Sequence, residues 1–318
     1  MRSRRVLLVG LGTIAQTHLE VLSRRTDVTL VGGVDPIADD ARLPVHRGVD
    51  AALAAVPDPD LVVVATPTPT HLSVVLEVLE RSSALILSEK PLATAVSEVD
   101  ALSAALSRGG DRVRVAHHFA FSPEVEWGLR FVTERGWARP TRVVASFNDA
   151  YSRLSSSRQA SLVSSWVDTG PNQISLLAPF TGPCTLVSHT DKRHRSVTVL
   201  AHDGGQSVLT SNWLAADSSK RTSLVYDGER ELHLDHSALT ATVMEAGSVT
   251  HHVGYTGDAG RKEAHYRGLY DVLLADPQDT RLGVPLARSI AALLEAAVHA
   301  PSPSPEVVWS TISAGAIE

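Results

Sequence analysis

The sequence is poor in cysteine and lysine and has no long apolar run. Cys184 is the one cysteine in 318 residues, which excludes a disulfide bond within the chain and suits a reducing compartment. No apolar run approaches the roughly 20 residues that a membrane-spanning helix requires. Asp and Glu outnumber Lys and Arg by 35 to 29, so the net charge of -6 offers nucleic acid no basic field. These shortages predict a cytoplasmic protein that binds neither membranes nor nucleic acid.

The first part of the chain alternates two kinds of apolar pattern. Short, branched and nearly continuous apolar runs are separated by segments in which apolar residues recur at helical spacing. The runs predict five strands, namely RRVLLVG, VTLVGGVD, LVVVAT, ALILSEK and RVRVAHH. Because strand and helix alternate, residues 1–118 are predicted to form an α/β Rossmann domain with a parallel, doubly wound sheet.

The pattern changes from residue 119 onward, where extended runs joined by Gly and Asp turns dominate. Helices are expected near residues 168–180, 261–275 and 283–299. Residues 119–318 are therefore predicted to form an α+β domain with an open, mainly antiparallel sheet. The Ser-rich stretch 152–165 is expected to be either an ordinary surface loop or a mobile lid.

A phosphate-binding pattern lies where the first strand meets the first helix. The segment VGLGTIA has the spacing G-x-G-x-x-A, and its candidate cofactor-binding residues are Gly10, Gly12, Thr13, Ile14 and Ala15. Glycines let the backbone approach a pyrophosphate, and the helix N-terminus offers unpaired N–H groups; a tight turn without a ligand is the alternative. Asp35 closes the next strand, where a carboxylate accepts from ribose hydroxyls. Since Asp35 would repel a 2′-phosphate and no Arg follows it directly, NAD is expected in preference to NADP.

Two further motifs follow later strands, ATPTPTH up to His71 and the triplet Glu89-Lys90-Pro91. Together with the glycine motif and Asp35, in this order, they resemble the glucose–fructose oxidoreductase, inositol dehydrogenase and rhizopine catabolism (Gfo/Idh/MocA) family. The resemblance implies an NAD(P)-binding Rossmann domain, a sugar-like substrate bound by the second domain, and a homodimer or homotetramer. It also implies further cofactor contacts from Thr66, Pro67, His71, Glu89 and Lys90.

Lys90 is the catalytic residue that the resemblance implies, facing both substrate and nicotinamide. The chain has only four lysines against 25 arginines, and Lys90 is the sole lysine before Lys192. An amine exchanges protons where a guanidinium cannot, which suits a catalytic role; an exposed lysine in a turn is the alternative. By the same resemblance, the peptide bond between Lys90 and Pro91 is expected to be cis.

The segment from Asp168 to Asn172, DTGPN, departs from the family pattern D-x-G-x-H-x-x-D. Asn172 stands where the family commonly has His, and Ser175 replaces the second Asp. An amide cannot take up a proton at physiological pH, but it can donate to one oxygen and accept from a hydroxyl. The segment resembles a subgroup of aldose 1-dehydrogenases that act on L-arabinose and D-galactose. In that subgroup an Asp and an Asn lie beside the sugar, which implies catalytic roles for Asp168 and Asn172.

The expected chemistry is the oxidation of a sugar hydroxyl. It requires a hydride acceptor, which NAD supplies, and a group that takes the hydroxyl proton, for which Lys90 and Asp168 both remain candidates. An anomeric carbon needs no strong base, because the ring oxygen stabilises developing positive charge. The replacement of His by Asn172 therefore favours an aldose 1-dehydrogenase that forms a lactone. The alternatives are a tailoring oxidoreductase for a cyclitol, amino sugar, nucleotide sugar or imine, and a non-catalytic dinucleotide-sensing protein.

Three further residues are candidates for substrate binding. His117 ends the last Rossmann strand beside His118, and because neighbouring side chains point to opposite faces, at most one of the two reaches a substrate. Asp149 follows a strand and either binds hydroxyls or belongs to a solvated turn. Tyr266 lies in HYRGLY and is either a core residue or a platform for a sugar. No metal site is expected, because Cys and carboxylate partners are not clustered at ligand spacing.

Overall fold

The computed structural model describes residues 2–56, 58–109, 111–154, 162–256 and 260–304. The chain divides into two compact units. The first comprises the residues up to His117 together with Leu269–Ala291, and the second comprises His118–Gly268 and the residues from Ala292 onward. The expected domain boundary near residue 118 stays a prediction. The division into units also assigns residues 269–291 to the first unit.

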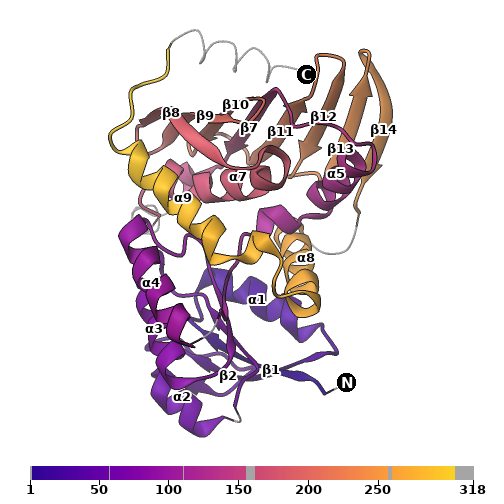
Figure 1. Ribbon diagram of the computed structural model, residues 1–318. Helices are drawn as coiled ribbons and strands as arrows, with labels where there is room; N and C mark the ends of the chain where they lie inside the picture. The colour runs from indigo at the N-terminus through magenta and orange to yellow at the C-terminus, as the bar shows by residue number, and fades with distance from the viewer. Residues whose placement is uncertain (1, 57, 110, 155–161, 257–259, 305–318) are drawn as a thin grey trace. The chain divides into compact units, whose positions relative to one another are not determined.

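The first unit is built on a six-stranded parallel sheet of order β3-β2-β1-β4-β5-β6. Figure 1 labels its strands β1 and β2. Its strands are β1 (Arg4–Val9), β2 (Val28–Val34), β3 (Val45–His46), β4 (Leu61–Val64), β5 (Leu85–Ser88) and β6 (Val113–Val115). Its helices include α1 (Thr13–Ser23), α2 (Val49–Ala55), η1 (Thr68–Thr70), α3 (His71–Arg81) and α4 (Val96–Gly109). The parallel Rossmann sheet is confirmed, and β3 is the strand that the apolar runs did not predict because it is two residues long.

The core of the first unit also draws on a distant part of the chain. Val284, Ala287 and Ala291, from the first part of α9 (Val284–Ala297), pack with the buried side chains of the Rossmann sheet and helices. Residues of β4 are wholly buried, as expected of a central parallel strand that is covered on both faces. Before α9 lies a short helix, η4 (Thr280–Leu282).

The second unit contains an eight-stranded sheet of order β14-β13-β12-β11-β7-β10-β9-β8. Its strands are β7 (Arg142–Asn148), β8 (Cys184–Asp191), β9 (Arg195–His202), β10 (Gly205–Asn212), β11 (Ser219–Val225), β12 (Arg230–Asp235), β13 (Thr240–Glu245) and β14 (Ser248–Gly254). Its helices include η2 (His118–Phe121), α5 (Pro123–Glu134), η3 (Tyr151–Arg153), α7 (Ser165–Thr181) and the first part of α8 (Arg261–Ala275). Only the pair β7–β10 is parallel, so the expected α+β unit with a mainly antiparallel sheet is confirmed.

The helices of the second unit cover its sheet in two places. Helix α7 packs on β8, β9 and β10, and α5 packs on β12 and β13. The expected Ser-rich loop falls partly on residues 155–161, outside the described residues. Within the part of the chain that the structure describes, no helix has the length and apolar character to cross a membrane.

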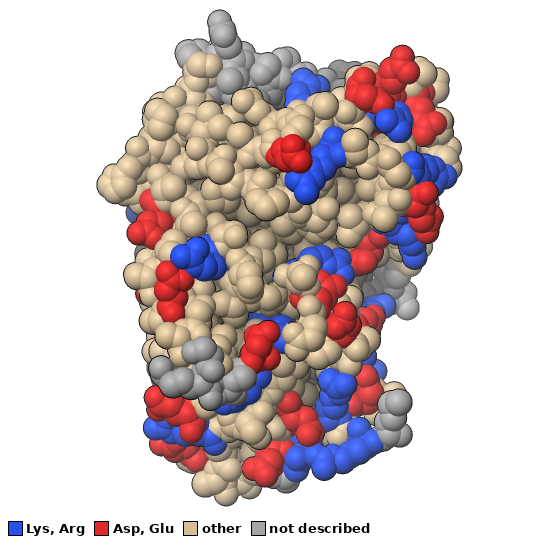
Figure 2. Space-filling view, viewed as in Figure 1, with Lys and Arg blue, Asp and Glu red and all other residues tan. Residues whose placement is uncertain are grey.

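Charge is mixed on the surface. On the face that Figure 2 displays, Lys and Arg lie among Asp and Glu, and neither sign forms a broad continuous field. This agrees with the small net charge of the sequence, -6 over 318 residues.

Candidate active site

The glycine turn of the first unit has the geometry that a dinucleotide needs. Gly10 has φ +89°, and a Cβ there would lie 2.7 Å from the carbonyl carbon of Ala65, so a side chain is excluded. A Cβ on Gly12, by contrast, would meet nothing within 4 Å. No side chain caps α1, which begins at Thr13 and thus presents its first N–H groups beside this open space.

Asp35, at the end of β2, is held by the backbone around it. Its carboxylate accepts from the N–H groups of Leu11, Ile37 and Ala38 at 2.9, 2.9 and 2.7 Å. Burial alone would raise the pKa of Asp35, but these hydrogen bonds lower it below the usual 3.8, so the group stays ionised. Thr66, at the end of β4, has a buried hydroxyl without a partner among the described residues. The open glycine turn, the fixed carboxylate and this unpaired hydroxyl fit a bound dinucleotide.

Two arginines lie in the same region, although the sequence separates them from Asp35. Arg47 donates to the carbonyls of Asp35 and Ala38 and pairs with Asp39. Arg42 pairs with Asp40. Sequence reasoning did not identify Arg47, because 12 residues separate it from Asp35. Since both guanidiniums already have acidic partners, neither offers an uncommitted charge to a 2′-phosphate.

We expect NAD to bind at least about tenfold more tightly than NADP, a difference of roughly 1.4 kcal/mol. The reason is that the ionised Asp35 repels a 2′-phosphate while Arg42 and Arg47 are neutralised by neighbouring carboxylates. Dissociation constants measured by titration of each cofactor check this expectation, and Asp35→Ser should narrow the difference. Equal constants for the two cofactors in the wild-type chain would contradict it.

The Glu89-Lys90-Pro91 motif follows β5, and its peptide bond between Lys90 and Pro91 is cis, as the resemblance implied. Glu89 is buried and accepts from Nε2 of His18 at 3.1 Å and from the backbone N–H of Lys90 at 3.1 Å. The hydroxyl of Tyr270 donates to Nδ1 of His18 at 2.7 Å, and burial raises the pKa of this tyrosine well above 10. Tyr270, His18 and Glu89 therefore form a buried chain of hydrogen bonds that ends at the backbone of Lys90.

Sequence reasoning did not identify His18. The position was nevertheless detectable, because Ala15, His18, Leu19 and Leu22 share the buried face of α1 at helical spacing. A histidine on such a face must find hydrogen-bond partners within the protein. Its partner Tyr270 lies 252 residues away, which the sequence does not reveal.

His71 and His117 were candidates for cofactor and substrate contacts, and both are buried. Nδ1 of His71 lies 2.8 Å from the carbonyl of Pro91, and its Nε2 lies 2.8 Å from that of Thr66. His71 thus ties together the two segments that carry the predicted cofactor residues. Nδ1 of His117 donates to the carbonyl of Arg281 at 3.0 Å. Contacts of these imidazoles with cofactor or substrate stay predictions.

We expect His117 to make the first unit sensitive to acid. Burial, aided by the nearby charge of Lys90 and opposed by the hydrogen bond to Arg281 and the charge of Glu89, lowers the pKa of His117 from 6.5 to about 4. Between about pH 6.5 and pH 4, His117 therefore stays neutral in the folded chain but takes up a proton in the unfolded chain. The free energy of unfolding thus falls as the pH drops through this range. The shift in pKa corresponds to a loss on the order of 3 kcal/mol in the free energy of unfolding.

Thermal denaturation between pH 7 and pH 4 checks this expectation. His117→Gln keeps a donor for the carbonyl of Arg281 but cannot titrate, so its Tm should fall less with pH than that of the wild type. His299→Gln, at an exposed position, serves as the matched control. The same dependence of Tm on pH in the wild type and in His117→Gln would show that His117 does not contribute.

Helix α7 carries the DTGPN segment in the second unit. It begins after Ser164, whose hydroxyl accepts from the N–H of Val167 at 3.3 Å and caps the helix. Gly170 is required because a Cβ there would lie 2.6 Å from the ring of Trp166. Gln173 donates to a carbonyl of β7 at 3.0 Å and to a carbonyl of β10 at 2.9 Å, which fixes the rotation of α7 on the sheet.

The fixed rotation determines where Asp168 and Asn172 lie, one helical turn apart. Asp168 is partly exposed, whereas Asn172 is buried. Nδ2 of Asn172 donates to the backbone carbonyl of Asp168 at 3.5 Å, and its Oδ1 has no partner among the described residues. Ser175, which replaces the second Asp of the family pattern, donates to the carbonyl of Asn172 at 3.0 Å. The free oxygen of Asn172 can accept from a ligand hydroxyl.

Asp149 is not in a solvated turn. It is buried, and its Oδ2 lies 2.5 Å from Nζ of Lys220, another residue that sequence reasoning missed. The scarcity of lysine was the only indication in the sequence, since burial of Lys220 depends on strand pairing.

Tyr266 is wholly buried and stacks on His118 with ring centroids 4.7 Å apart, so it is a core residue, the first of the two alternatives expected for it. Of the candidate residues, Asp149, Asp168 and Asn172 lie in the second unit, and Lys90 and His117 lie in the first.

Residues 4–117 match the family model described as an oxidoreductase family with an NAD-binding Rossmann fold, GFO_IDH_MocA. The chain is 35% identical to an inositol 2-dehydrogenase of Mycolicibacterium smegmatis over 133 residues, 39% of this chain and 38% of that protein. The match therefore spans about two fifths of the length of this relative.

Solved structures share the fold over nearly the whole chain. A myo-inositol dehydrogenase from Corynebacterium glutamicum superposes with a TM-score of 0.77 at 17% identity, covering 94% of this chain and 96% of that one. A UDP-N-acetylglucosamine 3-dehydrogenase from Acidithiobacillus ferrooxidans gives 0.76 at 18% identity, covering 95% and 98%. Residues 4–117 thus match the Gfo/Idh/MocA oxidoreductase family model, and the two-unit fold is shared with solved dehydrogenase structures over nearly the whole chain.

Proposed function

We propose that the chain is an NAD-dependent dehydrogenase that oxidises a CH–OH group of a sugar-like alcohol. The observation that carries the proposal is Lys90, placed directly after β5 in the unit with the open glycine turn and Asp35. Asp168 and Asn172 supply the second unit with a carboxylate and a free amide oxygen of the kind that binds hydroxyls. A homodimer or homotetramer in the cytoplasm is part of the same proposal, and light scattering measures the oligomeric state.

The proposed mechanism gives each of these side chains one role. The open glycine turn and Asp35 would hold NAD, which would supply the hydride acceptor. Lys90 and Asp168 act on the hydroxyl of the carbon that is oxidised, and one of them takes its proton. Glu89, anchored by His18, fixes the backbone from which the Lys90 side chain extends. Asn172 orients the substrate by accepting from a hydroxyl through Oδ1.

The finer proposal is an aldose 1-dehydrogenase that forms a lactone. Asn172 supports it, because its amide cannot serve as a base and the oxidation of an anomeric hydroxyl needs no strong one. The second candidate is a cyclitol dehydrogenase, favoured by the 35% identity to an inositol 2-dehydrogenase over 133 residues. A non-catalytic dinucleotide-sensing protein is the third, and the presence of both Lys90 and Asp168 argues against it.

One screen separates these candidates. The purified chain is incubated with NAD or NADP and a panel of aldoses and cyclitols, and NADH or NADPH absorbance is followed. An aldose oxidised to a lactone supports the 1-dehydrogenase. Oxidation of inositols alone replaces it by the cyclitol dehydrogenase, and binding of NAD without turnover of any alcohol contradicts the proposed function.

A further inference from the structure

Lys220 forms a buried ion pair that the proposed mechanism does not use. Its Nζ lies 2.5 Å from Oδ2 of Asp149, and both side chains are only 7% exposed. The pairing of β11 with β7 creates this contact, because Lys220 stands opposite Phe147 and Asp149 directly follows β7. The ammonium also lies 5.2 Å from the centre of the Phe147 ring. Burying a charged pair is costly, and an apolar pair of similar size is often no less stable, so stability alone does not explain it.

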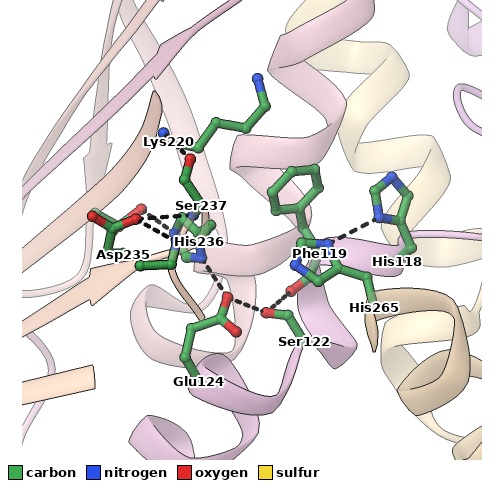
Figure 3. A network of polar contacts seen from close by, with 11 residues as sticks. His118, Phe119, Ser122, Glu124, Lys220, Asp235, His236, Ser237 and His265 are labelled. Atoms are coloured by element: carbon green, nitrogen blue, oxygen red, sulfur yellow. Dashed lines mark hydrogen bonds and ion pairs between the residues drawn. The ribbon is translucent and has the colours of Figure 1, made fainter. Parts of the chain in front are cut away.

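The backbone of Lys220 is fixed on both sides. Its N–H donates to the hydroxyl of Ser237 at 2.9 Å, and its carbonyl accepts from the N–H of His236 at 2.8 Å. The imidazole of His236 in turn donates to Glu124 at 2.7 Å, which also accepts from Ser122 at 2.6 Å (Figure 3). Figure 3 shows the Lys220 side chain extending away from this network. The amine is therefore presented from a rigid support, as a positioned functional group requires.

Charged groups from three other elements surround the amine. Asp149 follows β7, Asp168 lies on α7 and Arg261 begins α8. Burial lowers the pKa of Lys220 from 10.5 to about 8, Asp149 and Asp168 oppose this shift, and Arg261 adds to it. Lys220 thus changes charge close to physiological pH, in electrostatic range of the predicted catalytic carboxylate Asp168.

Neighbouring polar atoms lack partners among the described residues. Buried atoms without a hydrogen bond include Nη1 of Arg261 and Oδ1 of Asn172. Arg261 interacts electrostatically with Asp149, and Asn172 lies one turn from Asp168 on α7, so both belong to the surroundings of Lys220. These atoms comprise one donor and one acceptor, which a hydroxyl-bearing ligand satisfies, since a hydroxyl both donates and accepts.

We propose that Lys220, held by Asp149, is a substrate-positioning residue that donates to a hydroxyl of a neutral, polyhydroxylated substrate beside Asp168 and Asn172. The inference rests on the proposed function and adds the substrate class. Lys220 and Arg261 already interact with the carboxylates of Asp149, Asp168, Glu124 and Asp235, so an added substrate carboxylate would leave an uncompensated charge in a buried cluster. The site therefore selects uncharged sugars or cyclitols over the corresponding acids.

The kinetic test removes the pair as a whole, because Lys220→Gln alone leaves Asp149 buried without its cation. In Asp149→Asn/Lys220→Gln, KM for D-galactose or myo-inositol should rise about 10- to 100-fold, the range for losing hydrogen bonds to charged groups. NAD affinity should not change, since the residues expected to bind the dinucleotide lie in the first unit.

The pH dependence of KM gives a second test. Wild-type KM should rise as the pH passes about 8, where Lys220 loses its charge, and the double variant should lack this rise. Lys192→Gln, at an exposed position, is the control.

A binding test works without turnover. With only four lysines, a chain labelled with ¹³C-lysine gives few side-chain signals, which single substitutions assign. D-galactose or myo-inositol should shift the Lys220 signal and leave that of Lys192 in place, and D-galacturonate should bind more weakly. A response of Lys220 without oxidation supports the inference and overturns the proposed function. Oxidation with neither a Lys220 response nor a rise in KM overturns the inference alone, as does a preference for D-galacturonate.

Discussion

Replacing Lys90 by Ala is expected to abolish turnover, with a loss of about 10²–10⁴, while leaving the dissociation constant for NAD nearly unchanged. Lys90 is proposed to act on the substrate oxygen rather than on the dinucleotide, whose phosphate and ribose contacts come from the glycine turn and Asp35. Steady-state kinetics and NAD titration measure the two quantities separately. Lys192→Ala, at an exposed position in the second unit, should behave like the wild type.

Lys90→Arg distinguishes proton transfer from simple charge. A guanidinium keeps the positive charge but does not give up its proton, so this variant should be nearly as inactive as Lys90→Ala. If Lys90→Arg retains more than about a tenth of wild-type turnover, a loss under ~1.4 kcal/mol, the residue supplies charge alone. Asp168 would then be the remaining candidate for the base.

The second large effect is expected from Asp168→Asn. The change keeps the size of the side chain and removes the carboxylate, so kcat should fall by about 10²–10⁴ if Asp168 takes part in proton transfer. Asp168 partly exposes its side chain near the start of a well-anchored helix, and the change should leave α7 folded. Turnover and Tm are measured together, so that loss of activity is separated from loss of structure.

Asp217→Asn provides the matched control, because Asp217 is an exposed aspartate between β10 and β11. It should change neither kcat nor Tm. If Asp168→Asn keeps a stable fold and wild-type turnover, the proton relay does not include Asp168. Lys90 alone would then have to accept the hydroxyl proton.

Local patterns in the sequence were sufficient for the architecture. Alternating apolar runs and helical periodicities predicted the parallel sheet of the first unit, and extended runs predicted the mainly antiparallel sheet of the second. The expected helices near 168–180, 261–275 and 283–299 correspond to α7, α8 and α9. The glycine turn was equally predictable, because the G-x-G-x-x-A spacing is local, and the left-handed conformation of Gly10 agrees with it. These features depend on neighbouring residues, which a sequence displays directly.

The partners of the polar side chains were decided by the tertiary structure alone. Asp149 and Lys220 lie 71 residues apart and meet only because β7 pairs with β11, while His18 meets Tyr270 across 252 residues. Residues 269–291 likewise belong to the first unit, although their helical pattern does not indicate against which core they pack. Periodicity fixes which face of an element is apolar, but not which other element covers it. Burial and hydrogen-bond partners, and with them the lowered pKa values of His117 and Lys220, therefore follow from packing over long distances in the chain.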